Sequence, residues 1–68
     1  MTVLCNGEPL ALEAGATVAG LLEQVGVEPD ARGIAVAVDG EVVPRGRWAE
    51  LRLAPDARVE VVTAIQGG

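Results

Sequence analysis

The spacing of apolar residues changes twice along the chain, and this change constrains the fold more than any other feature. Val18, Leu21, Leu22 and Val25 recur at the spacing of one helix face. Before and after them, apolar residues alternate or form short runs between turn residues, which is typical of strands. Because 68 residues leave room for one domain only, the strands must share a sheet that the single helix covers on one face.

Turn and cap residues set the expected element boundaries. Thr17 suits the N-cap of the helix, and Gly26 suits the position just after its end. Asp39-Gly40 is a strong hairpin signal, and Pro44 should end a strand or mark a sheet edge. We predict a first turn over residues 6–9, strands over residues 2–6, 10–12, 33–39, 41–43 and 58–65, an irregular or 3₁₀ segment over 45–50 and a brief extended piece over 51–53.

This order of elements predicts an α+β fold of the β-grasp, or ubiquitin-like, class. The right-handed connection rule makes the first and last strands parallel neighbours in a small mixed sheet. We expect residues 1–64 to form the domain and residues 65–68 to form a flexible tail. A fold of this class does not by itself define a function.

The composition excludes most catalytic and ligand-binding classes. The chain has no His and no Lys, which removes the imidazole base, the Schiff-base amine and the Walker lysine. A single cysteine, Cys5, cannot form an internal disulfide or supply a zinc or iron–sulfur site. We therefore expect a protein with no catalytic residues, no metal ligands and no cofactor of its own.

The charge balance indicates the kind of partner. Ten acidic residues against five arginines give a net charge of −5, which argues against nucleic acids and anionic membranes and favours a basic protein surface. No apolar run reaches the length of a membrane span, and no signal-peptide pattern opens the chain. We expect a cytoplasmic protein that is monomeric when free.

The last predicted strand divides its side chains between two faces. One face would carry Val59, Val61 and Thr63, and the other would carry Glu60, Val62 and Ala64. If the face with Val59 packs against the helix, the face with Val62 is the open one. The small side chains predicted to form a shallow apolar docking face for a partner are Val62, Ala64, Ala35 and Ala37. The alternative is that they are ordinary scattered surface residues.

The chain ends in Gly67-Gly68, and this is where chemistry is expected. Two glycines make a thin, sterically unobstructed segment that can enter a narrow channel and present the carboxylate of Gly68 to a nucleotide. A partner enzyme would recognise Ile65, Gln66 and Gly67 as parts of the same tail. The alternative is a frayed terminus that happens to be glycine.

Over essentially all 68 residues the sequence resembles the ThiS family of sulfur carriers. The resemblance rests on the opening strand ending in Asn6-Gly7, on Thr17-Val18 before Leu21-Leu22, and on the segments 42–45, 48–49 and 61–68. The Val-Pro-Arg sequence followed by Trp48 is its most discriminating part. Pro55-Asp56-Ala57 departs from the family's usual turn, which puts only the geometry of that turn in doubt.

The resemblance implies that this chain is a substrate and carrier. A ThiF-type enzyme would use ATP and magnesium to adenylate Gly68, and sulfur from a cysteine desulfurase would then give a thiocarboxylate. A ThiG-type thiazole synthase would take that sulfur for the thiazole ring of thiamine. The alternatives are a MoaD-like carrier serving molybdopterin or another sulfur-containing metabolite, and a non-reactive ubiquitin-like interaction module.

Four other residues are weaker candidates. Cys5 could accept a persulfide, but its place beside Val3 favours a small core residue. Trp48 could anchor a partner, although as the single aromatic residue it could equally cap the core. Arg45 and Arg47 could pair with an acidic partner, or could simply be solvated.

Overall fold

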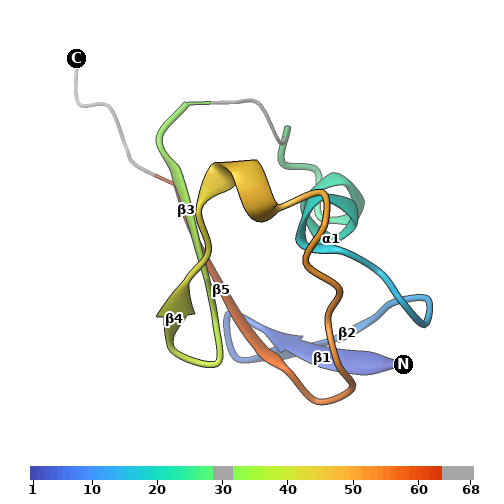
Figure 1. Cartoon of the computed structure of the whole chain (residues 1–68). Coiled ribbons are helices and arrows are strands. Elements are labelled where there is room, and N and C mark those ends of the chain that lie inside the picture. The colour runs from blue at the N-terminus through green and yellow to red at the C-terminus, as the bar shows by residue number, and fades with distance from the viewer. Residues whose placement is uncertain (29–31, 64–68) are drawn as a thin grey trace.

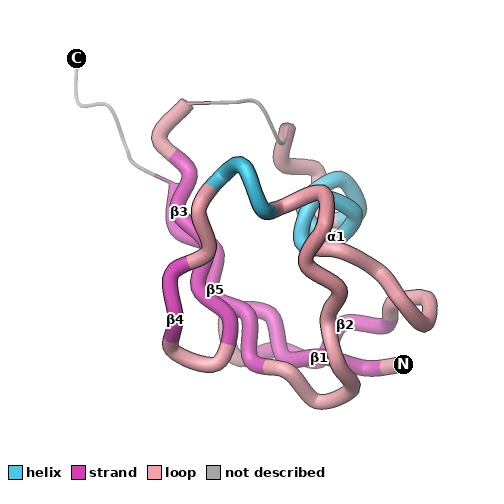
Figure 2. The backbone as a smooth tube through the Cα atoms, viewed as in Figure 1, coloured by secondary structure: helices cyan, strands magenta, loops and turns pink. Residues whose placement is uncertain are grey.

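The computed structural model describes residues 1–28 and 32–63, and within them one mixed sheet carries a helix on one face (Figures 1 and 2). The elements are β1 (Thr2–Cys5), β2 (Glu8–Ala11), α1 (Val18–Gln24), β3 (Ile34–Val38), β4 (Glu41–Val42), a 3₁₀ turn η1 (Arg45–Arg47) and β5 (Arg58–Thr63). The strand order is β2-β1-β5-β3-β4. β1 and β5 are parallel, whereas the other neighbouring pairs are antiparallel. The predicted β-grasp arrangement is confirmed.

The helix forms where the apolar spacing predicts it. The Thr17 hydroxyl accepts a hydrogen bond from the Gly20 backbone N–H at 3.1 Å and so caps the N-terminus. At the other end, Gly26 has a φ of +83°, the left-handed conformation that follows a helix. Val18, Leu21 and Leu22 are fully buried. Val25, the fourth residue of the predicted stripe, is instead 40% exposed because it already lies at the C-cap.

Two tight hairpin turns have the same geometry. Asn6 and Asp39 have φ of +51° and +50°, and the glycine after each also has positive φ, which is the type I′ pattern. The first turn is shorter than predicted, so β2 begins at Glu8 and contains Pro9. Proline is tolerated there because β2 is an edge strand.

The core lies between α1 and the inner face of the sheet, and Trp48 closes one end of it. The indole is only 3% exposed, and its Nε1–H donates to the Val43 carbonyl at 2.9 Å. Trp48 therefore caps the core, and its interpretation as a partner anchor is wrong for this structure. The buried apolar residues are Val3, Leu12, Val18, Leu21, Leu22, Val36, Val43, Trp48, Leu53, Ala57 and Val59.

One predicted extended segment, over residues 51–53, differs from the structure. Residues 51–53 form a single bridge, between Arg52 and Thr17, rather than a strand. Backbone hydrogen bonds from Val18 to Leu51 and from Leu53 to Ala16 attach this segment to the start of the helix. β5 is described to Thr63, so the predicted continuation to residue 65 lies outside the described residues.

Candidate docking face and carboxyl-terminal segment

The two faces of β5 differ as the alternating pattern predicts. Val59 points into the core and is 1% exposed, whereas Val62 is 59% exposed on the opposite face. The register places Ala35 beside Val62 and Ala37 beside Glu60. Three of the four residues predicted to form the docking face therefore share one surface, and Ala64 lies outside the described residues.

Val42 belongs to the same surface, although the sequence analysis did not include it. It pairs with Ala37 across β3 and β4, and its side chain is 76% exposed. The available signal was the alternation of residues 41–43, in which Val43 is buried and its neighbour must face outward. We call Val42, Ala37, Ala35 and Val62 the open-face strip.

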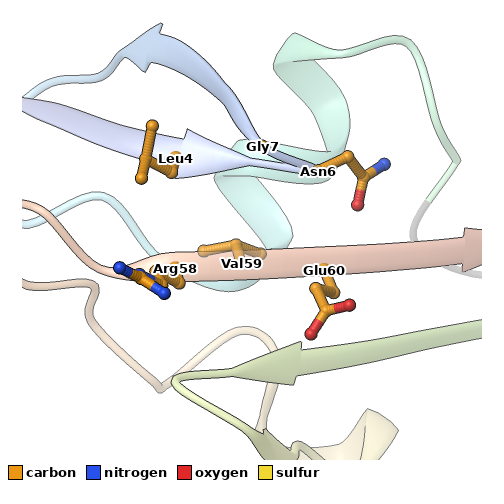
Figure 3. Close-up of a pocket in the computed structure, with 6 residues that line it drawn as sticks. All are labelled: Leu4, Asn6, Gly7, Arg58, Val59 and Glu60. Atoms are coloured by element: carbon orange, nitrogen blue, oxygen red, sulfur yellow. The ribbon is translucent and has the colours of Figure 1, made fainter.

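A hollow lies next to this strip, between β1 and β5. Figure 3 shows Leu4, Asn6 and Gly7 on its β1 side, with Arg58, Val59 and Glu60 along β5. Arg58 and Glu60 supply one charge of each sign beside the apolar side chain of Leu4. The lining of the hollow thus combines apolar, polar and charged side chains.

The residues predicted to be recognised or modified all lie outside the described residues. They are Ile65, Gln66, Gly67 and Gly68. The last described residue before them is Thr63, which is exposed and pairs with Ile34 at the end of β5. Thr63 thus shares β5 with Val62 of the open-face strip.

Cys5 lies on the helix-facing side of the sheet, as predicted, but is only partly buried. Burial raises the pKa of the Cys5 thiol, and the nearby Glu8 carboxylate raises that pKa further. Because the thiolate is the nucleophile, this environment makes Cys5 less reactive than an ordinary thiol. It favours the packing role over that of a persulfide acceptor.

The two arginines next to Trp48 make contacts within the chain. The Arg45 guanidinium lies 4.5 Å from the centroid of the Trp48 ring, within range of a cation–π interaction. Arg47 lies 3.9 Å from the Glu50 carboxylate, and both of these side chains are more than 60% exposed. An exposed pair of this kind contributes little to stability.

Two further findings concern metals and membranes. In residues 1–28 and 32–63, no group of three His, Cys, Asp or Glu side chains is placed to hold a metal ion. No helix within these residues is long and apolar enough to cross a bilayer.

A family model of known proteins matches residues 3–68, and it is the model of the ThiS family. The chain belongs to the ThiS family. The Escherichia coli sulfur carrier protein ThiS is 32% identical over the full length of both chains. The matched range thus runs from the first strand to residue 68.

Solved ThiS structures share the fold of this family member. The crystal structure of a thiamine biosynthesis protein (ThiS) from Geobacter metallireducens superposes with a TM-score of 0.81 at 26% identity, covering all of both chains. A solution structure of a thiamine biosynthesis protein from the same organism gives a TM-score of 0.76 at 25% identity, covering all of this chain and 88% of the other.

Two other relatives of this ThiS-family chain are much longer. Proteins named thiazole synthase from Magnetococcus marinus and Paramagnetospirillum magneticum are 41% and 35% identical to it over all 68 residues. The chain spans about a fifth of the length of each. A ThiS-like segment is therefore part of the same polypeptide as the rest of each relative.

Proposed function

We propose that this chain carries sulfur for thiazole formation in thiamine biosynthesis, as a thiocarboxylate on Gly68. The observation that supports this most strongly is the full-length similarity to the E. coli sulfur carrier protein ThiS. The ThiS family match also extends through Gly68. The proposal requires a free carboxyl group on Gly68 in the working carrier.

The carboxylate must be activated before sulfur can replace oxygen. A ThiF-type enzyme, using ATP and magnesium, would convert it to an acyl-adenylate and release pyrophosphate. A protein persulfide formed by a cysteine desulfurase would attack the acyl carbon through its terminal sulfur and displace AMP. A thiol would then reduce the resulting acyl disulfide and leave the thiocarboxylate on Gly68.

In this scheme the chain is the substrate of its partner enzymes rather than a catalyst. Its sequence contains no His and no Lys, which supports this assignment because neither an imidazole base nor an amine nucleophile is available. ATP and magnesium would be bound by the adenylating enzyme, and the carrier would work as a cytoplasmic monomer between encounters.

The proposed sulfur acceptor is a ThiG-type thiazole synthase. The support comes from the two relatives named thiazole synthase, in which a segment similar to this chain is part of a longer polypeptide. Joining a carrier to its acceptor raises their effective concentration, which is useful when one delivers a group to the other. The open-face strip would dock the adenylating enzyme while the residues after Thr63 reach its active site.

Mass spectrometry of the intact protein tests the proposal. The chain is incubated with ATP, magnesium, a ThiF-type enzyme, a cysteine desulfurase, cysteine and a thiol reductant. We expect a mass gain equal to the replacement of oxygen by sulfur, located on Gly68 by fragmentation. A matched reaction without ATP should leave the mass unchanged.

Deletion of Gly68 provides the specific control. The shortened chain should fold normally, because Gly68 follows the domain, but should show no adenylation in a pyrophosphate-exchange assay. Adenylation of the shortened chain would contradict the proposal. Sulfur transfer only with molybdopterin-pathway enzymes would support the MoaD-like alternative, and no modification by either set would support an interaction module.

A further inference from the structure

Two side chains from different hairpin turns bond to the backbone of β5 from its two edges. Asn6 lies in the β1–β2 turn, and Asp39 lies in the β3–β4 turn. Their backbones have almost the same positive φ, +51° and +50°. The difference is where they bond: Asn6 holds Val61, near the end of β5, whereas Asp39 holds Arg58, at its start.

The Asn6 side chain continues the pairing with β5 at the point where the backbone of β1 turns away. The Asn6 backbone N–H donates to the Val59 carbonyl at 2.8 Å, and the chain then turns away into β2. Its side-chain Oδ1 accepts from the Val61 N–H at 2.8 Å, and its Nδ2 donates to the Val61 carbonyl at 3.2 Å. An amide is suited to this arrangement because it offers a donor and an acceptor together. The hydrogen bonding between this edge and β5 thereby continues to Val61, although the backbone of β1 ends at Cys5.

This contact is placed where it can fix the direction of the strand end. Val61 is two residues before Thr63, the last described residue, and all the proposed chemistry lies beyond it. On the other edge of β5, β3 pairs with residues up to Thr63. Asn6 is therefore the contact from the β1 side that holds the final part of the described strand.

We propose that Asn6 is a positioning residue for adenylation: its side chain fixes the end of β5 so that Gly68 is directed into the active site of the adenylating enzyme. This inference rests on the proposed function. Asn6 touches no reacting atom and acts through Val61. Small errors in the placement of a reacting group reduce rates strongly, by up to about a hundredfold per ångström.

Asp39 provides a matched control within the same molecule. Its Oδ1 accepts from the Arg58 N–H at 2.9 Å, and its own N–H donates to the Arg58 carbonyl at 2.8 Å. Asn6→Gly and Asp39→Gly each remove a turn side chain that hydrogen-bonds to the backbone of β5. Each variant has a Gly-Gly turn, which adopts positive φ without strain. The two variants differ in which end of the strand they release.

The experiment compares adenylation kinetics and thermal unfolding of the two variants. Both variants should have a Tm a few degrees below that of the wild type, and the two decreases should be similar. A decrease of this size is expected when exposed hydrogen bonds are lost from a domain of this size. Only Asn6→Gly should lower the kcat of pyrophosphate exchange, by about tenfold or more, with KM changed less than twofold because the open-face strip is intact. Equal kcat values for the two variants would overturn the proposal.

Asn6→Asp adds a conservative variant. The carboxylate can still accept from the Val61 N–H, but it has no N–H to donate to the Val61 carbonyl. Its kcat should lie between those of the wild type and Asn6→Gly. A kcat as low as that of Asn6→Gly, with Val61 N–H exchange as slow as in the wild type, would contradict the proposal.

A structural measurement separates failure of this inference from failure of the proposed function. If the wild-type chain is not adenylated at all, the proposed function fails. Residual dipolar couplings of the Val62 and Thr63 amides then test the positioning on their own. They should change in Asn6→Gly and stay unchanged in Asp39→Gly. Couplings unchanged in both variants would show that Asn6 does not set the strand direction.

Discussion

The two faces of the sheet carry similar apolar residues but differ in how far those residues are buried. On the face toward α1, Val3, Val36 and Val59 are at most 1% exposed. On the opposite face, Val62 and Val42 are 59% and 76% exposed. Residue type alone therefore does not separate the core from an exposed face of the sheet. The covering helix makes the difference, and its presence on one face follows from the order of the elements.

This comparison can be tested most directly by placing the same charge on each face of β5. Val59→Glu puts an unpaired carboxylate into the core, which costs several kcal/mol in a protein that has only about 5–15 kcal/mol of stability. We expect the variant to lose its cooperative thermal transition and its amide dispersion in NMR spectra. For Val62→Glu, the free energy of unfolding should differ from that of the wild type by no more than about 0.5 kcal/mol. A stably folded Val59→Glu would show that the two faces are not distinct.

A smaller effect is expected when the cap of the core loses one polar contact. Trp48→Phe keeps an aromatic ring but removes the Nε1–H that bonds to the buried Val43 carbonyl. The free energy of unfolding should fall by about 1–3 kcal/mol, measured by urea titration. Arg47→Ala, which removes only an exposed ion pair, should change it by less than about 0.5 kcal/mol. Equal effects would mean that Trp48 stabilises by contact area alone.

On the open face, the effect should appear in binding rather than in stability. Val62→Glu should weaken binding to the adenylating enzyme about tenfold, equal to about 1.4 kcal/mol, measured by calorimetry. Val25→Glu places the same charge on another exposed valine, at the end of α1, and should bind like the wild type. If both variants bind equally well, the open-face strip is not the docking surface.

The smallest expected effect concerns Cys5, at the margin of the buried face. Because burial and Glu8 raise its pKa in the folded state, folding favours the protonated thiol. Stability from this group is present below the unfolded-state pKa and is lost as the pH rises through the folded-state value. The wild type should therefore lose slightly more stability than Cys5→Ser in alkaline solution, measured by urea unfolding. The opposite order would contradict the raised pKa.

Regular spacing and turn chemistry were sufficient to predict most of the fold. The helix, the Asp39-Gly40 turn and the parallel pairing of β1 with β5 follow from local patterns and one rule of handedness, whereas the first turn is shorter than its sequence predicts. Val25 fits the spacing of the buried helix face, but it lies at the C-cap and is exposed, which the spacing alone does not indicate. Trp48 could not be placed because its burial depends on distant segments that meet only in the folded chain.

Strand alternation also predicts part of the open-face strip. Val62, Ala35 and Ala37 alternate with buried residues, so their outward direction follows from strand geometry. Val42 was missed because the alternation of residues 41–43 shows that Val42 faces outward only once Val43 is known to be buried. The hydrogen bonds of the Asn6 side chain to Val61 were also missed, since the sequence indicates a turn but not which distant backbone lies beside it.

The central position of β5 has a consequence for how the chain folds during synthesis. The β1–β2 hairpin and the β3–β4 hairpin are neighbours of β5 but not of each other, and β5 is translated after both. Until residues 58–63 leave the ribosome, each hairpin has an unpaired inner edge and the sheet cannot close. Chains whose translation stops before β5 thus lack the shared central strand, and proteases should degrade them readily. Only a chain translated through β5 can form the sheet that supports its carboxyl-terminal residues.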